Sequence, residues 1–132
     1  MTALAAFVVL RDGSGRVLVA EREDGKGWNL PGGGVGNDET PWEAALRETR
    51  EEVGVEAEIL RLAGLYHVPE RETLVFLFEC RPRAGEAQPL QETLAVAWCR
   101  PDALPATMLP RHAERVRDVV AGSTAPLLKV QR

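Results

Sequence analysis

The stretch from Gly33 to Val55 holds three glutamates that stand close together, Glu48, Glu51 and Glu52. On a helix with about 3.6 residues per turn, these positions are related by i, i+3 and i+4, so their carboxylates share one face. Like charges this close repel each other unless a cation neutralises them. Mg²⁺ and Mn²⁺ take oxygen ligands of this kind. The segment therefore predicts a divalent-metal site on a helix, beside a glycine-rich loop, and this combination suits phosphate chemistry.

The sequence marks both ends of that helix. Thr40, Pro41 and Glu43 match a capping box, with Thr40 as the N-cap, Pro41 at N1 and Glu43 at N3. Gly54 suits the left-handed position that ends a helix. Residues at helical spacing predict a stripe that faces the core, formed by Trp42, Ala45, Leu46, Thr49 and Val53.

Apolar runs rich in β-branched residues predict the strands that carry this helix. The expected strands cover residues 3–10, 16–22, 56–67, 73–81 and 94–99. Residues 31–34, which read PGGG, are expected to break regular structure. A second helix is predicted over residues 110–120, with its buried side formed by Ala113, Val116, Val119 and Val120, and with His112 facing solvent. Residues 122–132 are predicted to form a flexible tail.

Length and charge exclude several classes of protein. A chain of 132 residues is expected to form a single domain, residues 1–132. Its net charge of −4 argues against a general nucleic-acid-binding protein, which needs a basic face. No apolar run is long enough to span a membrane, and the first ten residues lack the features of a secretory signal. We therefore expect a cytoplasmic protein whose partner is neither a membrane nor a polymeric nucleic acid.

The two cysteines, Cys80 and Cys99, lie in no metal-binding spacing. Each adjoins apolar or aromatic residues, so both are expected to be small buried side chains. A disulfide between them stays open as an alternative.

Residues 33–55 resemble the Nudix box, G-x5-E-x7-R-E-U-x-E-E-x-G-U, where U is a bulky aliphatic residue. The positions in register are Gly33, Glu39, Arg47, Glu48, Glu51, Glu52, Gly54 and Val55. Thr49 is the one departure, because it stands where an aliphatic residue is usual. The resemblance implies an α/β fold, the Nudix-type α/β/α sandwich with a mixed central sheet and two main helices.

The resemblance also implies an activity, hydrolysis of a nucleoside diphosphate linked to another moiety with Mg²⁺ or Mn²⁺. Glu48, Glu51 and Glu52 would be the metal ligands, and a main-chain carbonyl at Gly32 would complete the coordination. Bound metals polarise phosphoryl oxygens and activate water, which the slow hydrolysis of an anionic diphosphate requires. Glu52 is expected to lie nearest the chemistry, followed by Glu51.

The general base is left open between the box and a loop. Glu92 is the loop candidate, because many Nudix proteins carry a glutamate near this position. Arg47 is expected to hold a box carboxylate in place through paired hydrogen bonds. Glu39 is expected to steady the loop or to reach the metal through water.

Arg22 stands where related proteins often present a basic residue to phosphate, and Lys26 lies in the following loop. The alternative for Arg22 is a solvated strand end among acidic neighbours. Gly33 and Gly34 are expected to let the backbone approach the substrate closely. Three residues that sequence reasoning left between structural and ligand-contact roles are Trp28, Tyr66 and His67.

The resemblance leaves the substrate open. An ADP-ribose-like nucleotide sugar is favoured, because Pro69 and the Trp98…Leu104-Pro105 stretch resemble features of relatives that cleave ADP-ribose. The alternative is a (d)NTP pyrophosphohydrolase that removes damaged nucleotides. A non-catalytic nucleotide-sensing module is less favoured, since such modules typically lose glutamates from the box and none is missing here. Relatives that cleave nucleotide sugars often form dimers, so a homodimer stays open.

Overall fold

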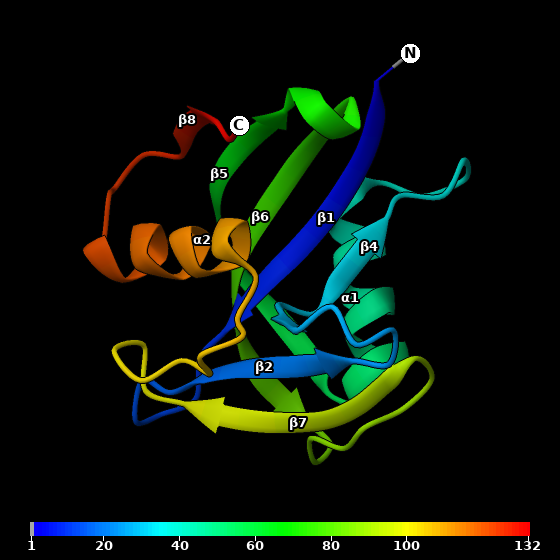
Figure 1. The fold of residues 1–132 in the computed structure, drawn as a ribbon, viewed down its shortest axis with the longest axis vertical. Coiled ribbons are helices and arrows are strands. Elements are labelled where there is room, and N and C mark those ends of the chain that lie inside the picture. The colour runs from blue at the N-terminus through cyan, green and yellow to red at the C-terminus, as the bar shows by residue number, and fades with distance from the viewer. Residues whose placement is uncertain (1) are drawn as a thin grey trace.

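The computed structural model describes residues 2–132. Two β-sheets and two helices form its frame (Figure 1). In chain order the elements are β1 (Ala3–Leu10), β2 (Val17–Arg22), β3 (Trp28–Asn29), β4 (Gly32–Gly34), α1 (Pro41–Val53), β5 (Glu56–Val68), the short 3-10 helix η1 (Pro69–Arg71), β6 (Thr73–Ala84), β7 (Thr93–Cys99), α2 (Pro110–Ala121) and β8 (Leu127–Val130).

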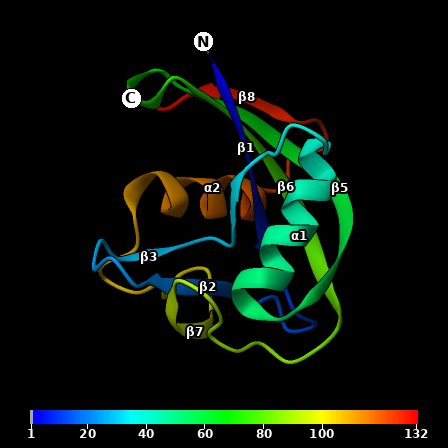
Figure 2. The same cartoon turned by 90° about the vertical axis from the view of Figure 1, so that its right-hand side faces the viewer.

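The larger sheet is mixed, with the strand order β4-β1-β6-β5-β8. Its centre is the parallel pair β1 and β6, in register from Ala3↔Thr73 to Leu10↔Cys80. The smaller sheet has the order β3-β2-β7 and is antiparallel. The larger sheet lies between α1 and α2, as Figure 2 shows from the side. The predicted α/β sandwich with a mixed sheet and two helices is therefore confirmed.

Strand β1 divides the core between the two helices, because successive side chains of a strand point to opposite faces. Ala6, Val8 and Leu10 pack with Ala44, Ala45 and Val53 of α1. Val9, between them, packs with Val116 and Val119 of α2. Tyr66 is fully buried in the α2 cluster. Two hydrophobic layers thus fix each helix against its own face of the sheet.

Helix α1 begins and ends as its sequence predicts. The Thr40 hydroxyl accepts a hydrogen bond from the Glu43 N–H (3.1 Å), and the Glu43 carboxylate accepts one from the Thr40 N–H (2.9 Å). Gly54 ends the helix in the left-handed conformation with φ 73°. The stripe predicted to face the core is wrong at Trp42, which is 53% exposed; the buried side of the helix begins at Ala44.

Thr49 tolerates its place in the core because its hydroxyl is satisfied within the helix. The residue is fully buried, and its Oγ1 donates a hydrogen bond to the Ala45 carbonyl at 2.7 Å. A buried hydroxyl with a partner costs far less than one without. The departure from the Nudix pattern at this position therefore leaves the packing of α1 intact.

The prediction that His112 faces solvent is wrong. Its side chain is buried on α2, where Nδ1 accepts a hydrogen bond from the Leu30 N–H (3.0 Å). The ring meets Phe7 edge to face, with centroids 4.9 Å apart. Sequence reasoning also put Val120 on the buried side, whereas it is 42% exposed. The buried side of α2 includes the two polar residues His112 and Arg115 instead.

Two segments without a predicted strand join the larger sheet. Gly32–Gly34 pairs with β1 as β4, because glycine has no Cβ; a Cβ on Gly32 would lie 2.3 Å from the Ala6 carbonyl oxygen. The flexible tail predicted for residues 122–132 is wrong over Leu127–Val130, which pairs in parallel with β5 as β8. Lys129 also joins β8 to α2, because its Nζ donates to Glu114 and Asp118.

Both cysteines are free; Cys80 is buried and Cys99 is half-buried. Within residues 2–132, no helix has the length and apolar character needed to cross a membrane.

The capping box gives a test of the first helix. Thr40→Ala removes the acceptor for the Glu43 N–H, and we expect the free energy of unfolding to fall by about 1 kcal/mol. Urea denaturation measures the change. Thr124→Ala, at an exposed position outside the helices, is the matched control. Equal losses in the two variants would show that the cap contributes nothing.

His112 gives a test against pH. Burial, followed by the charges of Arg115, Arg22, Arg71 and Arg111, lowers the pKa of His112 well below 6.5. As the pH falls below about 6.5, His112 becomes protonated in the unfolded chain but stays neutral in the folded protein. The free energy of unfolding therefore falls by up to about 1.4 kcal/mol per pH unit.

His112→Asn keeps an acceptor for the Leu30 N–H but removes the titrating group. Its unfolding free energy should therefore depend less steeply on pH, as measured by urea denaturation between about pH 5 and 7.5. His67→Asn, at an exposed position of β5, is the matched control. A slope unchanged in His112→Asn contradicts the prediction.

Candidate active site

Strand β4 brings the glycine-rich segment directly against the acidic face of α1. A Cβ on Gly33 would lie only 3.0 Å from the carboxyl carbon of Glu48, so any larger residue would push that side chain aside. On the same strand, the Gly32 N–H donates a 3.0 Å hydrogen bond to the Glu52 carboxylate. The backbone and two of the predicted metal-ligating glutamates are therefore in direct contact.

Arg47 holds three carboxylates with one guanidinium. Its Nε and Nη2 bind the two oxygens of Glu39 at 2.9 and 2.7 Å. Its Nη1 reaches Glu48 at 3.1 Å and Glu51 at 2.9 Å. The hydrogen bond from Arg47 lowers the pKa of the Glu39 carboxyl to about 2. Sequence reasoning expected Arg47 to orient one carboxylate; the structure has it bind the loop and the helix together.

Glu52 differs from its neighbours because it is largely shielded from water and makes no ion pair with Arg47. Burial raises the pKa of Glu52 to about 8, and the nearby Glu48 and Glu51 carboxylates push it further in the same direction. The hydrogen bond from the Gly32 N–H opposes this shift. A carboxyl held neutral by burial and by like charges becomes a good ligand once a cation is present.

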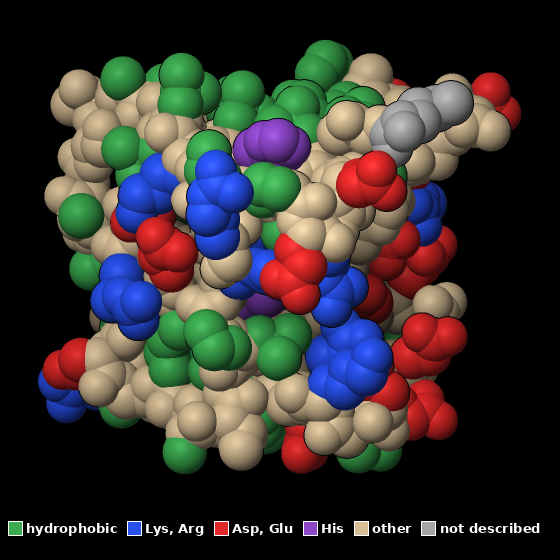
Figure 3. All heavy atoms as spheres, turned by 45° about the horizontal axis from the view of Figure 1, so that its top comes forward, with side chains coloured by type: hydrophobic (Ala, Val, Ile, Leu, Met, Phe, Trp, Pro, Cys, Tyr) green, Lys and Arg blue, Asp and Glu red, His purple; other side chains and the backbone are tan. Residues whose placement is uncertain are grey.

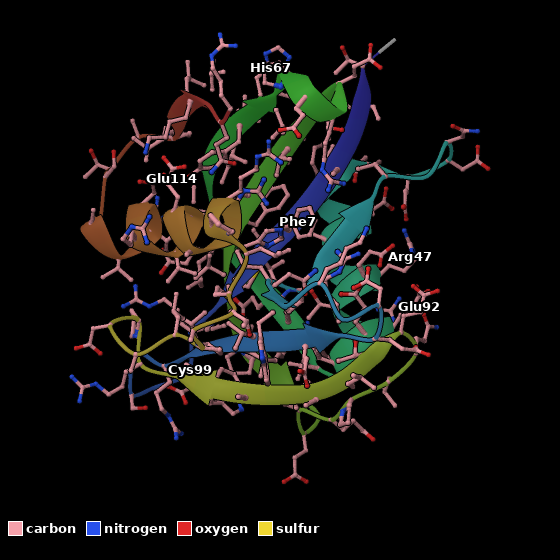
Figure 4. The ribbon with its side chains drawn as sticks, viewed as in Figure 1. Phe7, Arg47, His67, Glu92, Cys99 and Glu114 are labelled. Carbon is pink, nitrogen blue, oxygen red and sulfur yellow. The ribbon has the colours of Figure 1, made fainter. Side chains whose placement is uncertain are left out.

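A cavity of about 490 Å³ opens in front of Glu52. Its lining includes Arg22, Glu92 and Gly33, so the structure brings these predicted residues together with Glu52. The full lining is Phe7, Glu21, Arg22, Glu23, Asp24, Asn29, Gly32, Gly33, Glu52, Glu92 and Thr93. In Figure 4, Arg47 of α1 and Glu92 of the turn before β7 lie on the same side of the molecule.

Backbone contacts fix Glu92 at the edge of this cavity. Its carbonyl accepts a hydrogen bond from the Glu23 N–H at 3.0 Å, which ties the turn to the loop after β2. Gln91, just before it, adopts the left-handed conformation with φ 43°. The side chain is exposed to solvent at the cavity. Glu52 and Glu92 therefore stay alternatives for the general base, one buried and one accessible.

Arg22 lines the cavity, but Asp24 holds its guanidinium through Nε and Nη2. This hydrogen bonding lowers the pKa of the Asp24 carboxyl to about 2. Lys26 is exposed and does not line the cavity. Gly34 lines a second cavity instead.

The donor set fits a hard divalent cation, but the ligands are not preformed. Three carboxylates on one helix face, one of them with a raised pKa, favour a bound cation. Yet among residues 2–132, no three His, Cys, Asp or Glu side chains stand close enough together to hold a metal ion. Two of the three carboxylates, those of Glu48 and Glu51, accept hydrogen bonds from Arg47 instead.

The second cavity, of about 290 Å³, adjoins the first and shares Phe7, Arg22 and Gly33 with it. Apart from Arg22, sequence reasoning missed the basic residues of this cavity, since nothing in their spacing marks them as neighbours. They come from η1 and α2 and are Arg71, Arg111, His112 and Arg115. In Figure 3, Lys and Arg side chains gather around a hollow on one face of the molecule.

The residues left between structural and ligand-contact roles lie outside both linings. The Tyr66 hydroxyl donates to Asp118 at 2.9 Å within the protein. His67 is exposed on β5, and Trp28 packs against the core beside α2.

Comparison with known proteins identifies the family. The NUDIX domain family model matches residues 1–121. The chain belongs to the Nudix family. As a Nudix-type hydrolase it acts on phosphoric anhydride bonds of small-molecule nucleotides, in a family that generally uses divalent metal cations.

Two relatives extend over most of the chain. A MutT-like protein of Streptomyces ambofaciens is 36% identical over 118 residues, which cover 89% of this chain and 76% of the relative. A Bacillus subtilis protein, named as a proposed 8-oxo-dGTP diphosphatase, is 34% identical over 119 residues, which cover 89% of this chain and 80% of the relative. Among solved structures, a Nudix hydrolase from Nitrosomonas europaea has the same fold, with a TM-score of 0.86 at 22% identity over 99% of this chain and 80% of that one.

Glu52→Gln tests the acidic face as a metal site. The change keeps the size of the side chain but removes the negative charge that the carboxyl takes on when it binds a cation, so we expect Mn²⁺ to bind at least about tenfold more weakly. Electron paramagnetic resonance of free Mn²⁺ measures the affinity.

Glu92→Gln makes the same chemical change elsewhere in the cavity and should leave Mn²⁺ affinity close to that of the wild type. Thermal unfolding of both variants checks that they fold. Equal affinities in wild type and Glu52→Gln would remove Glu52 from the proposed ligand set.

Proposed function

We propose that this Nudix hydrolase cleaves the diphosphate bridge of a nucleoside diphosphate linked to another moiety, with an ADP-ribose-like nucleotide sugar as the substrate class. The main support is that the two cavities share Phe7, Arg22 and Gly33. A substrate that carries a bulky group on each side of its diphosphate has room on both sides of this junction. A substrate with one bulky end needs only one of the two spaces.

We propose Glu48, Glu51 and Glu52 as ligands of Mg²⁺, with Mn²⁺ as an alternative ion and the Gly32 carbonyl as a further ligand. Such an ion, when bound, neutralises phosphate charge and activates water for attack on phosphorus. Arg47 prepares this face, because its hydrogen bonds hold the Glu48 and Glu51 carboxylates in place beside each other.

The chain's other residues bind the anion and move the proton. Arg22 lines the first cavity and can exchange Asp24 for a substrate phosphate, since both partners are oxyanions. Glu52 and Glu92 are the two candidates that accept the proton of the attacking water, because both carboxylates line this cavity. Gly33 and Gly34 let the substrate approach the backbone of β4.

A second candidate function is hydrolysis of a nucleoside triphosphate to a monophosphate and pyrophosphate. The names of the two relatives favour it, one being MutT-like and the other a proposed 8-oxo-dGTP diphosphatase. Both candidates use the same acidic helix, and they differ in what lies beyond the attacked phosphorus.

Product analysis separates the two candidates. The protein is incubated with Mg²⁺ and either ADP-ribose or a nucleoside triphosphate, in ¹⁸O-labelled water that marks the attacked phosphorus. We expect AMP and ribose 5-phosphate from ADP-ribose, loss of turnover with EDTA, and recovery when Mg²⁺ is added in excess.

Pyrophosphate from the triphosphate, with ADP-ribose left intact, would establish the second candidate instead. Turnover that persists in EDTA would refute the metal-dependent mechanism, and no turnover of either compound would refute both candidate functions.

A further inference from the structure

Arg115 is a buried cation without a counterion. Its side chain on α2 is 3% exposed, and its Nε donates to the amide oxygen of Gln131 at 3.1 Å. Within residues 2–132, none of the ion pairs closer than 4 Å includes Arg115. Burial lowers the pKa of Arg115 to about 10. Because a buried charge without a partner is strongly unfavourable, this guanidinium favours an anion.

Two aromatic rings hold the guanidinium in place. Its carbon lies 5.3 Å from the centre of the Phe7 ring and 5.6 Å from that of Tyr66. These rings orient the group but carry no net charge to neutralise it. Nη2 makes no hydrogen bond with residues 2–132. In that range, every side-chain nitrogen that is fully buried has a hydrogen-bond partner, so Nη2 is not fully enclosed. The space that Arg115 lines is the second cavity.

His112 adds a second donor at the same place. The Leu30 N–H donates to Nδ1, so the neutral ring carries its proton on Nε2. Nε2 lies 3.4 Å from Nη1 of Arg115, which can only donate. Two donors facing each other cannot satisfy one another. They need an acceptor, and both residues line the second cavity.

The other charged side chains of the second cavity also favour an anion. Among residues 2–132, its lining contains Arg22, Arg71, Arg111 and Arg115 and no Asp or Glu, whereas the charged residues of the first cavity are all acidic except Arg22. Arg22 pairs with Asp24 and Arg111 with Glu70. Arg71 is exposed and, like Arg115, takes part in no ion pair among residues 2–132.

A phosphomonoester matches these requirements. It carries about −1.5 to −2 charges near neutral pH, and its oxygens accept hydrogen bonds from several donors at once. Guanidinium groups bind phosphate oxygens in pairs. A base edge that presents an amino group would instead place a third donor against His112 and Arg115.

We infer that the second cavity binds a phosphate group of the substrate itself, separate from the phosphoric anhydride that is hydrolysed, and that Arg71, Arg115 and His112 determine this specificity. The inference rests on the proposed function, because the cavity adjoins the first through Phe7, Arg22 and Gly33. One molecule can thus place its anhydride at the acidic helix and a phosphomonoester among the arginines. The preferred substrates are nucleotides that are phosphorylated at a further position.

Two substrate pairs test this inference, and the members of each pair differ by one phosphomonoester. The first pair is ADP-ribose and 2′-phospho-ADP-ribose; the second is ATP and adenosine 3′-phosphate 5′-triphosphate. We expect kcat/KM to be about tenfold or more higher for the phosphorylated member of the pair whose parent is hydrolysed, mainly through a lower KM.

Variants connect that ratio to the cavity. Arg71→Ala changes an exposed residue, and Arg115→Met replaces the buried cation with an uncharged chain of similar length. Both should bring the ratio of the two kcat/KM values towards one, and Arg115→Lys should restore part of it. Arg117→Ala is the matched control, since it removes an exposed arginine of α2 outside the cavity lining and should keep the wild-type ratio.

Thermal unfolding shows whether Arg115→Met is folded. If this variant does not fold, Arg71→Ala still tests the inference, because Arg71 is exposed. Equal kcat/KM values within the hydrolysed pair, or a ratio that survives Arg71→Ala, would overturn the inference and leave the proposed hydrolase intact. Inhibition by inorganic phosphate that depends on Arg71, without any preference within the pair, would assign the cavity to free phosphate and also overturn it. No turnover of any of the four compounds would refute the proposed function itself.

Discussion

The guanidinium of Arg47 joins the three segments that build the acidic site. It binds Glu39 in the loop, Glu48 and Glu51 on α1, and the Gly34 carbonyl at the end of β4. Without a positive charge here, three glutamates on one helix face would repel each other and the loop would lose its anchor. The same arginine therefore neutralises the helix when no other cation does so. Two of the proposed metal ligands, Glu48 and Glu51, are therefore held by Arg47.

The two cavities of the site are lined by side chains of opposite charge. The first is acidic and contains the proposed ligand Glu52, whose buried carboxyl depends on an incoming cation for its charge. The second is basic and contains Arg115, whose buried guanidinium lacks an anion. Phe7 of β1 lies at their junction, touching the space of both. A site that favours cations thus lies beside one that favours anions. This arrangement is complementary in charge to a multiply phosphorylated molecule with a bound metal ion.

Local signals allowed much of this fold to be predicted, and tertiary contacts explain where prediction failed. Thr40 and Gly54 mark helix α1 through hydrogen bonds a few residues away, so its ends are right. β4 and β8 exist because β1 and β5 offer free edges, which no local pattern reveals. His112 looked like a surface residue because its partner, the Leu30 N–H, lies 82 positions away in the chain. For the same reason the box glutamates were found from sequence, whereas the basic cavity was not.

Gln131, the residue that follows β8, connects the edge of the larger sheet to the second cavity. Gln131 is 3% exposed; its Oε1 accepts from Arg115, and its Nε2 donates to the Arg111 carbonyl and to Glu114. One amide thereby sets the angle at which a cavity arginine is presented. The C-terminal segment consequently stabilises the position of helix α2. Any fusion or deletion that separates β8 from β5 would therefore also loosen the arginines of α2 that line the second cavity.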